Sequence, residues 1–394
     1  MSPKLLLCLL LCFSSFVLAA NAIPQNAVSQ PSSSTVQVVY VVDNGTILTY
    51  NVDPQTLYAT QVGTPLSLSG TLYSLRPSPS DHFLYVITYD VNLKKHLSVY
   101  PTDASGVPQT HATEVINANF IYDIQFDPQA NFAYLVYGYP SGTYNTLFEI
   151  ERFVVDPATG KISQPQVEAK YTLSNGSGGI SDCWLSILGF GAAGNELYDE
   201  VGCGYHGGNS ATYYERTLDL QTGTLGPDLQ VYSWNNATEG YESVSFVGNL
   251  MFDFVSPNNY QQGVNKVNIY PLVPNTSKTL VQCTATMLEA CGFASGAVVH
   301  PSGKYVFTLI SPNSVQIDKV QLSQKKIVDT GNYIPYQFGQ FSPDGTLVYG
   351  IYNSSPGYYI EIFGFNVSTS AVTTNGYVIS VPSAADSYFV AQRF

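Results

Sequence analysis

The chain has 394 residues, of which 45% are hydrophobic and only 11% are charged, and its formal net charge is -13. Intrinsic disorder is excluded, because disordered chains combine low hydrophobicity with high charge. A nucleic-acid partner is not expected, since 15 Lys and Arg stand against 28 Asp and Glu and phosphate binding requires clustered cations. The 30 Tyr, 32 Gly and 23 Pro favour strands and turns over helices.

The N-terminal 22 residues have the pattern of a signal peptide. Lys4 supplies a basic start, an apolar stretch follows over 5–18, and Ala20-Asn21-Ala22 matches the small residues that signal peptidase accepts. The apolar stretch is short for a bilayer span, which needs about 20 residues, although an uncleaved N-terminal anchor is the alternative. We therefore predict a signal peptide over 1–22, a flexible leader over 23–35, and a secreted or periplasmic protein without membrane insertion.

A short phrase recurs along the rest of the chain, in which an apolar strand, a tight turn and an aromatic-rich strand follow one another. Clear copies contain Pro79, Pro128, Pro301 and Pro343, and each has an aromatic residue six positions after the Pro. Pro and a following Asp-Gly or Ser-Gly pair supply the backbone angles of a tight turn. With three less regular copies, the aligned aromatic positions are Tyr40, Tyr85, Tyr134, Tyr198, Phe252, Phe307 and Tyr349.

The spacing of these positions indicates the fold. Neighbouring positions lie 42 to 64 residues apart, and four-stranded units of about 40–50 residues are the blades of a β-propeller. We predict an all-β, seven-bladed β-propeller of four-stranded blades over 36–394. The first unit lacks a first strand, and the segment 387–394 is a spare strand that would join it and close the ring. A transmembrane β-barrel is the alternative, but it needs spanning strands of about 9–11 residues.

The repeat resembles that of the lactonase-like, YVTN-repeat group of seven-bladed propellers. The resemblance rests on the phrases HPSGKYV over 300–306 and SPDGTLVY over 342–349, and on the turn DPATGKI over 156–162. It implies the propeller fold and, as activities, the opening of phosphogluconolactone or the cyclisation of muconate, with His, Arg and Glu side chains that polarise a carboxylate or lactone. No such set aligns in this chain. Arg152 and Arg216 fall in outward third strands, where we expect surface or strand-pairing roles.

Ligand sites of propellers are expected on the face formed by the second-to-third-strand loops and the inter-blade loops, which we call the loop face. All four cysteines beyond the signal peptide fall in these predicted loops, one of which is a long loop over 202–212. In an exported chain they predict the disulfides Cys183–Cys203 and Cys283–Cys291 rather than redox catalysis. Their spacing lacks the paired C-x-x-C of a zinc site, so we predict no metal.

The same loops carry the candidate binding residues, which are Asp182, Trp184, Glu200, Tyr205, His206 and Trp234. Glu200 and Asp182 could act as paired carboxylates and His206 as a base, whereas Trp and Tyr rings suit stacking on sugars or on a protein partner. The structural alternatives are solvation for the His and inter-blade packing for each Trp. Three acidic residues near the starts of inner strands could hold a cation at the channel mouth, namely Asp123, Glu242 and Asp386.

The sequence contains no recognised motif for a nucleophile, a cofactor or a metal. We therefore predict a secreted, monomeric scaffold without a cofactor, which binds a carbohydrate or a protein on its loop face and is not an enzyme. A lactonase-like hydrolase or cycloisomerase is the alternative that the resemblance implies, and a matrix protein without a small ligand is a third.

Overall fold

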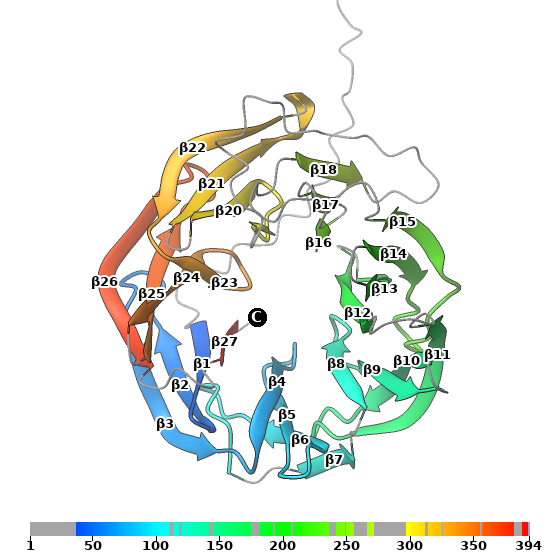
Figure 1. Ribbon diagram of the computed structural model, residues 1–394. Coiled ribbons are helices and arrows are strands. Elements are labelled where there is room, and N and C mark those ends of the chain that lie inside the picture. Colours follow the sequence, from blue (N-terminus) through cyan, green and yellow to red (C-terminus); the bar gives the residue numbers. More distant parts are fainter. Residues whose placement is uncertain are drawn as a thin grey trace, which may run out of the picture. The chain divides into compact units, whose positions relative to one another are not determined.

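Short antiparallel strands make up almost all of the part of the chain that the structure describes (Figure 1). In this computed structural model, the described residues are 37–110, 113–117, 120–141, 145–174, 182–191, 194–205, 208–235, 242–248, 250–255, 266–271, 297–311, 314–324, 326–354, 357–381 and 388–392. All of them belong to the unit Ser34–Phe394, whereas the unit Met1–Ser33 lies outside them. The signal peptide and the leader therefore stay predictions. Within the described ranges, no helix has the length and apolarity needed to cross a membrane.

The strands form seven sheets, each of which is one blade. Blade 1 contains β27 (Tyr388–Gln392), β1 (Gln37–Asp43), β2 (Thr46–Val52) and β3 (Ala59–Ser67). Blade 2 contains β4 (Thr71–Pro77), β5 (Phe83–Tyr89), β6 (Lys95–Pro101) and β7 (Thr113–Asn117). Blade 3 contains β8 (Ile121–Phe126), β9 (Phe132–Pro140), β10 (Asn145–Val155) and β11 (Ile162–Ser174). Blade 4 contains β12 (Asp182–Phe190), β13 (Glu196–Tyr205), β14 (Gly208–Thr217) and β15 (Leu229–Asn235).

The last three blades follow in chain order. Blade 5 contains β16 (Glu242–Val247), β17 (Leu250–Val255) and β18 (Lys266–Pro271), and the segment 272–296 after it lies outside the described residues. Blade 6 contains β19 (Ala297–Val299), β20 (Tyr305–Ser311), β21 (Ser314–Gln321) and β22 (Lys326–Ile334), with the 3-10 helix Leu322–Gln324 before β22. Blade 7 contains β23 (Gln337–Phe341), β24 (Leu347–Ser354), β25 (Gly357–Phe365) and β26 (Val372–Val381).

The innermost strands of successive blades contact one another. Contacts run from β27 to β4, β8, β12, β16 and β19 in turn, and β23 contacts both β27 and the strands β20 and β21 of blade 6. The predicted all-β, seven-bladed propeller is therefore confirmed, with three or four strands in each described blade. The strand β27 pairs antiparallel with β1, and Val390 lies opposite Tyr40.

The core lies between blades, where the apolar faces of neighbouring sheets meet. All seven aligned aromatic residues lie in the second strand of their blade and are buried. Tyr85 of blade 2, for example, packs with Phe126 and Leu135 of blade 3. Full burial of one such side chain contributes roughly 1.5–3 kcal/mol. The repeated phrase therefore marks the positions that hold adjacent blades together.

A hydrogen bond accompanies this packing at several blade junctions. The hydroxyls of Tyr40, Tyr85 and Tyr134 each donate to a glycine carbonyl in the third-to-fourth-strand turn of the next blade, at 2.6 Å. The accepting glycines are Gly106, Gly160 and Gly223, and all three have positive φ angles, which favour glycine. A side chain there would also clash, because a Cβ at Gly160 would lie 2.6 Å from the Phe83 ring.

Candidate functional site

Those nominated residues of blade 4 that the structure describes lie on strands rather than in a long loop. β13 continues to Tyr205 and β14 begins at Gly208, so the predicted loop over 202–212 is wrong and is mostly a hairpin. Strand pairing continues there because Cys203 and Gly204 keep partners on both sides. For Asp182, Tyr205 and Trp234 the structure describes the backbone position on a strand but not the side chain, and His206 lies outside the described residues.

Cys183 and Cys203 form the predicted disulfide. They are directly opposite each other in the antiparallel pair of β12 and β13, with a Cα–Cα distance of 3.9 Å. In the chain-entropy account, a bridge that closes a loop of this length contributes about 3 kcal/mol to the free energy of unfolding. Cys283 and Cys291 lie outside the described residues, so their pairing stays a prediction.

Glu200 is a half-buried carboxylic acid between blades 4 and 5. Its position, two residues after the aligned aromatic residue, is apolar in the six other blades, where it holds Val42, Ile87, Val136, Phe254, Leu309 and Ile351. Burial raises the pKa of Glu200, and hydrogen bonds from Trp184 and Tyr213 oppose that rise. The Tyr213 hydroxyl donates to Glu200 Oε1 at 3.3 Å, and both Trp184 and Phe246 of β16 pack against the cluster of Ala211 and Tyr213.

Glu200 and Asp182 do not form a carboxylate pair. Glu200 lies opposite Ser186, whereas Asp182 is four residues from Ser186 along the same strand, a separation of about 13 Å in extended backbone. Trp184 lies against Gly202, where a Cβ would be 2.4 Å from its ring. Trp184 and Glu200 are thus brought together, but by packing between blades.

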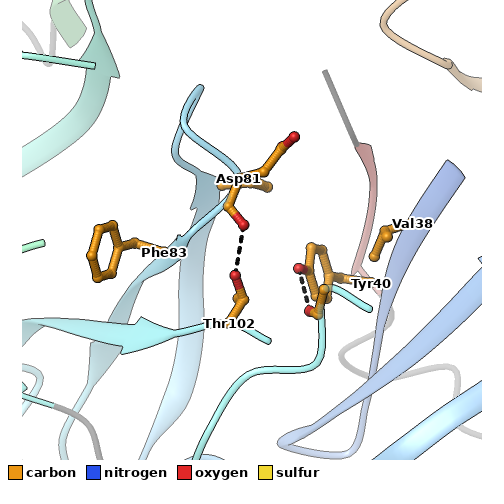
Figure 2. A pocket seen from close by; sticks show the side chains of 7 residues that line it. Val38, Tyr40, Asp81, Phe83 and Thr102 are labelled. Carbon is orange, nitrogen blue, oxygen red and sulfur yellow. Dashed lines mark hydrogen bonds between the residues drawn. The ribbon is translucent and has the colours of Figure 1, made fainter. Parts of the chain in front are cut away.

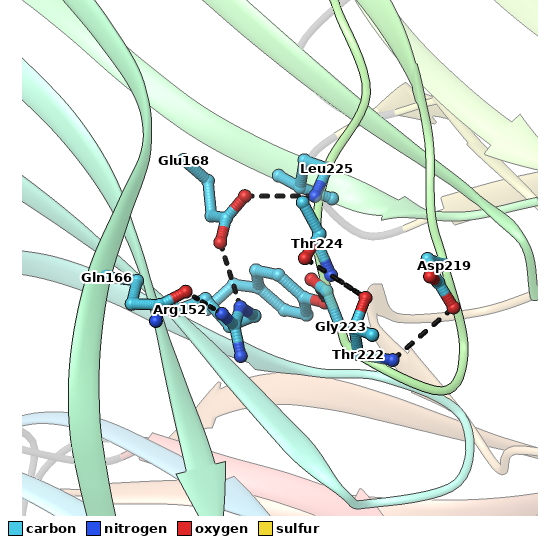
Figure 3. A network of polar contacts seen from close by, with 9 residues as sticks. Arg152, Gln166, Glu168, Asp219, Thr222, Gly223, Thr224 and Leu225 are labelled. Carbon is cyan, nitrogen blue, oxygen red and sulfur yellow. Dashed lines mark hydrogen bonds and ion pairs between the residues drawn. The ribbon is translucent and has the colours of Figure 1, made fainter.

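Arg152 and Arg216 are not surface residues, which corrects one of the two expected roles. Both are buried at the junction of blades 3 and 4, because the turns and strands of the adjacent blade cover the third strand. Arg152 Nε donates to Glu168 Oε1 at 2.8 Å, and Glu168 Oε2 accepts the backbone N–H of Leu225 in blade 4 at 3.0 Å (Figure 3). Arg216 Nε donates to Asp199 Oδ2 at 2.7 Å. Arg216 Nη2 also donates to the hydroxyl of Tyr171 in blade 3, so both arginines join blades 3 and 4.

A shallow pocket between blades 1 and 2 is part of the same kind of junction. It is lined by Val38, Tyr40, Pro77, Asp81, Phe83, Thr102 and Gly106 (Figure 2). Inside it, the Tyr40 hydroxyl donates to Gly106 O, and Thr102 Oγ1 donates to Asp81 O at 2.8 Å. Since the tyrosine-to-glycine bond recurs at the next two junctions, this pocket is a repeated structural feature rather than a special site.

A cluster of tyrosines around a buried lysine lies between blades 2 and 3. Lys95 Nζ is 3.7 Å from the ring centroid of Tyr73, 4.7 Å from that of Tyr122 and 5.5 Å from that of Tyr89. It also donates a hydrogen bond of 2.5 Å to Ile121 O. Burial lowers the pKa of Lys95 to about 8. Ammonium groups are attracted to aromatic ring faces, so the lysine fixes the three rings in place.

Two tyrosines of this cluster, Tyr73 and Tyr122, lie at β-bulges. The pairing of β4 with β5 shifts register at Tyr73, between Leu72 and Ser74, and the pairing of β8 with β9 shifts at Tyr122. A bulge turns the extra side chain away from its regular strand position and is common beside functional sites. Tyr122 is 45% exposed, and its ring lies against Gly138, where a Cβ would be 2.5 Å from it.

The cluster extends to an exposed aromatic surface on the loop face. Tyr89 ends β5 and Lys95 begins β6, so both adjoin a second-to-third-strand loop. Phe120 precedes β8, is 41% exposed and packs with Tyr139 at a ring-centroid distance of 5.1 Å. We call this group the tyrosine seam, and its members are Tyr73, Tyr89, Lys95, Phe120, Tyr122 and Tyr139.

An arginine and a carboxylate on inner strands lie beside the seam. Arg76 Nη2 of β4 is 3.5 Å from Asp123 Oδ1 of β8, and Gln125 Nε2 donates to Asp123 Oδ2 at 2.9 Å. Asp123 is thus held by an arginine, not poised for a cation. The side chain of Glu242 is not described, and Asp386 lies outside the described residues. No metal-binding group of His, Cys, Asp or Glu occurs in the described ranges.

Neither family models nor curated proteins match this sequence. Solved structures do match its fold. A candidate 6-phosphogluconolactonase from Bacteroides uniformis ATCC 8492 matches with a TM-score of 0.56 and 13% sequence identity, over 90% of this chain and 100% of that chain. A second one, from Bacteroides fragilis NCTC 9343, matches with a TM-score of 0.53 and 13% identity, over 91% and 99%. The resemblance to lactonase-like seven-bladed propellers is therefore confirmed at the level of structure.

Proposed function

We propose that the protein is a binding propeller that holds a carbohydrate on the tyrosine seam and carries out no chemistry itself. The observation that supports this most concerns the rings of Phe120 and Tyr122. Both rings are exposed, and contacts with neighbouring side chains already fix their orientation. Flat rings cover the C–H face of a sugar at low entropic cost, because few torsions must be ordered on binding.

The construction of the seam supports the same proposal. Tyr122 is supported by Gly138 on one side and by the Lys95 ammonium, and its T-shaped contact with Phe148 has a centroid distance of 5.8 Å. A ligand that stacks on such a ring does not have to order it first, so more of the contact energy appears as affinity. A protein ligand would use the same surface and is an outcome of the test below.

The setting of this function is also a proposal. The N-terminal pattern over 1–22 and the disulfide Cys183–Cys203 support an exported protein, because disulfides persist in oxidising compartments. We further propose that β27 closes the ring by completing blade 1, a role supported by its five paired residues on β1. Closure of this kind would cover the inner edge of β1.

A second candidate function is chemistry on a lactone. The likeness to the two Bacteroides structures favours it over pure binding, although a fold carries many functions. Hydrolysis would require a group that polarises the lactone carbonyl and a base that activates water. Arg76 and Lys95 are cations near the seam that could take the first role, and the nominated His206 lies outside the described residues.

One experiment separates the two candidates. The purified protein, Tyr122→Ala and the control Tyr58→Ala are tested on a glycan array and on a panel of sugar lactones. Tyr58 is a matched control because it is 55% exposed but lies in the turn between β2 and β3. We expect the wild type and Tyr58→Ala to retain a glycan that Tyr122→Ala loses by at least about tenfold, as for a stacking contact of 1–3 kcal/mol.

The other outcomes are equally informative. Lactone turnover without glycan retention would replace the binding proposal with the second candidate. Capture of a protein by the same seam, lost in Tyr122→Ala, would keep the seam but reject its carbohydrate ligand. Retention of a glycan equally by all three proteins would place the site elsewhere.

A further inference from the structure

We infer that the tyrosine seam selects an acidic carbohydrate, a chain that contains uronic acid, whose carboxylate pairs with Lys95 and Arg76. This inference rests on the proposed carbohydrate-binding function and adds the chemical class of the ligand. It comes from cations that the protein itself leaves partly unsatisfied.

Lys95 is a buried cation without a carboxylate partner in the described parts of the chain. Lys95 is only 7% exposed, and none of the ion pairs between described residues includes it. An ammonium has three N–H donors, and here one of them bonds to Ile121 O. Buried charges are normally paired, but this ammonium faces the rings of Tyr73, Tyr122 and Tyr89 instead of a carboxylate, so a ligand carboxylate would supply the missing negative charge.

Arg76, on the inner strand of blade 2, supports the same inference. Its Nε is buried and has no hydrogen-bond partner among the described residues. Its closest ionic contact, to Asp123, is long at 3.5 Å, and Gln125 shares that carboxylate. Buried donors without partners are rare in native proteins and call for a ligand, a water or an ion.

Charged groups of both signs surround the tyrosine seam. Lys95 lies over the Tyr73 ring and Arg76 contacts Asp123, whereas burial, Glu151 and Glu149 raise the pKa of Tyr139. Tyr73 connects Lys95 with Asp123, because Lys95 lies over its ring and Asp123 contributes to raising its pKa. The part of the seam at Tyr73 and Lys95 therefore favours an anionic group, and screening limits the repulsion from the acids near Tyr139.

Stacking rings beside unsatisfied cations match the two halves of a uronic acid residue. The sugar ring offers its C–H face to Tyr122 and Phe120, and the carboxylate offers charge-assisted hydrogen bonds to the ammonium and the guanidinium. A neutral sugar would use the rings alone and would leave the cations as they are. The seam should therefore distinguish two chains that differ only at the carboxylate.

The test is calorimetric titration with two β-1,4-linked oligosaccharides of equal length, one of glucose and one of glucuronic acid. We expect the wild type to bind the acidic chain at least about tenfold more tightly, as for a charge-assisted hydrogen bond. Lys95→Met keeps a long apolar stem among the rings and should abolish the preference. Lys170→Met is the matched control, since Lys170 lies on the outer strand β11 and pairs with Glu149 at 2.6 Å; it should keep the preference.

Each failure has its own meaning. Equal affinity for both chains would overturn the inference and leave the proposed function standing, whereas binding of neither chain would overturn both. If Lys95→Met loses its native circular dichroism, Arg76→Gln replaces it, because Arg76 is partly exposed beside the seam. A preference that survives Arg76→Gln unchanged would then overturn the pairing of the carboxylate with these cations.

Discussion

The residue before each turn proline is buried and polar, and its identity differs from blade to blade. Ser78, Asp127, His300 and Ser342 occupy this position. Asp127 Oδ1 accepts the backbone N–H of Phe132 at 2.6 Å, and Ser342 Oγ accepts that of Leu347 at 2.9 Å. Each side chain thus satisfies a backbone donor of its own turn, which explains why one structural position accepts three residue types.

His300 has the same role and needs no catalytic explanation. Its Nδ1 accepts the backbone N–H of Ser302 at 3.0 Å, so Nε2 carries the proton and donates to Gly345 O of blade 7 at 2.8 Å. The ring also packs with Phe341 at a centroid distance of 5.0 Å. Burial lowers the pKa of His300 to about 4, so the neutral ring is the form that the fold requires.

This lowered pKa predicts a dependence of stability on pH. The unfolded His titrates near 6.5, so between about pH 6.5 and pH 4 the unfolded state binds a proton that the folded state does not. The contribution of the neutral His is therefore complete above pH 6.5 and is lost on acidification, by at most about 3 kcal/mol. His300→Ser, with the residue of blades 2 and 7, should lack this loss.

Urea unfolding of the wild type and His300→Ser at pH 7.5, 6 and 4.5 checks the prediction. We expect the wild type to be more stable at pH 7.5, because the variant loses ring packing, and the difference in free energy of unfolding to shrink as the pH falls. A difference that stays constant across this range would contradict the account of His300.

At the scale of elements, the innermost strands determine where a ligand surface can form. Bulges in β4 and β8 shift the register opposite the second and third residues after the aligned aromatic residue, whereas bulges in β12 and β23 do so opposite that residue and the next one. Blades 2 and 3 place Tyr73 and Tyr122 at the bulge, whereas blade 4 places Leu188 there. The candidate site thus forms where two neighbouring blades share the position of the bulge and each places a tyrosine at it.

The strand β27 offers a second test at this scale. Deletion of 388–394 removes five residues that pair with β1 and should lower the free energy of unfolding by about 5 kcal/mol, at about 1 kcal/mol for each lost hydrogen bond. The exposed edge of β1 should also promote aggregation. Deletion of 393–394 alone is the control, because those residues lie beyond the strand.

Thermal unfolding followed by circular dichroism, together with light scattering, measures both effects. A long deletion that matches the control in stability and scattering would show that β27 does not close the ring.

At the scale of the whole molecule, the fold was predictable and the site was only partly so. Turn chemistry and aromatic spacing identified all seven second strands, because these features serve packing between blades and recur in each one. Cys183 and Cys203 could be paired because an exported chain and their short separation favoured it, although both lie on strands and not in the predicted loops. The seam could not be found in this way, since Tyr73 and Tyr122 resemble core aromatics in sequence and only the bulges and adjacent blades decide their exposure.

For the same reason, the sequence could not predict the burial of the two arginines or the packing of Glu200 between blades. Arg152 and Arg216 lie on outward strands of their own sheets, but the adjacent blade covers them. Glu200 departs from an apolar pattern and was a reasonable candidate, yet Trp184 and Tyr213 account for it between two blades. Contacts between blades join residues far apart in the chain, and the repeat does not specify them.

Hydroxyl-radical footprinting of the protein with and without a bound glycan tests most directly whether the ligand occupies the tyrosine seam. We predict that ligand reduces modification of Phe120 and Tyr122, which are 41% and 45% exposed, and leaves Tyr58 and Tyr333, at 55% and 44%, unchanged. Protection of Tyr58 or Tyr333 instead, with Phe120 and Tyr122 still modified, would contradict the account.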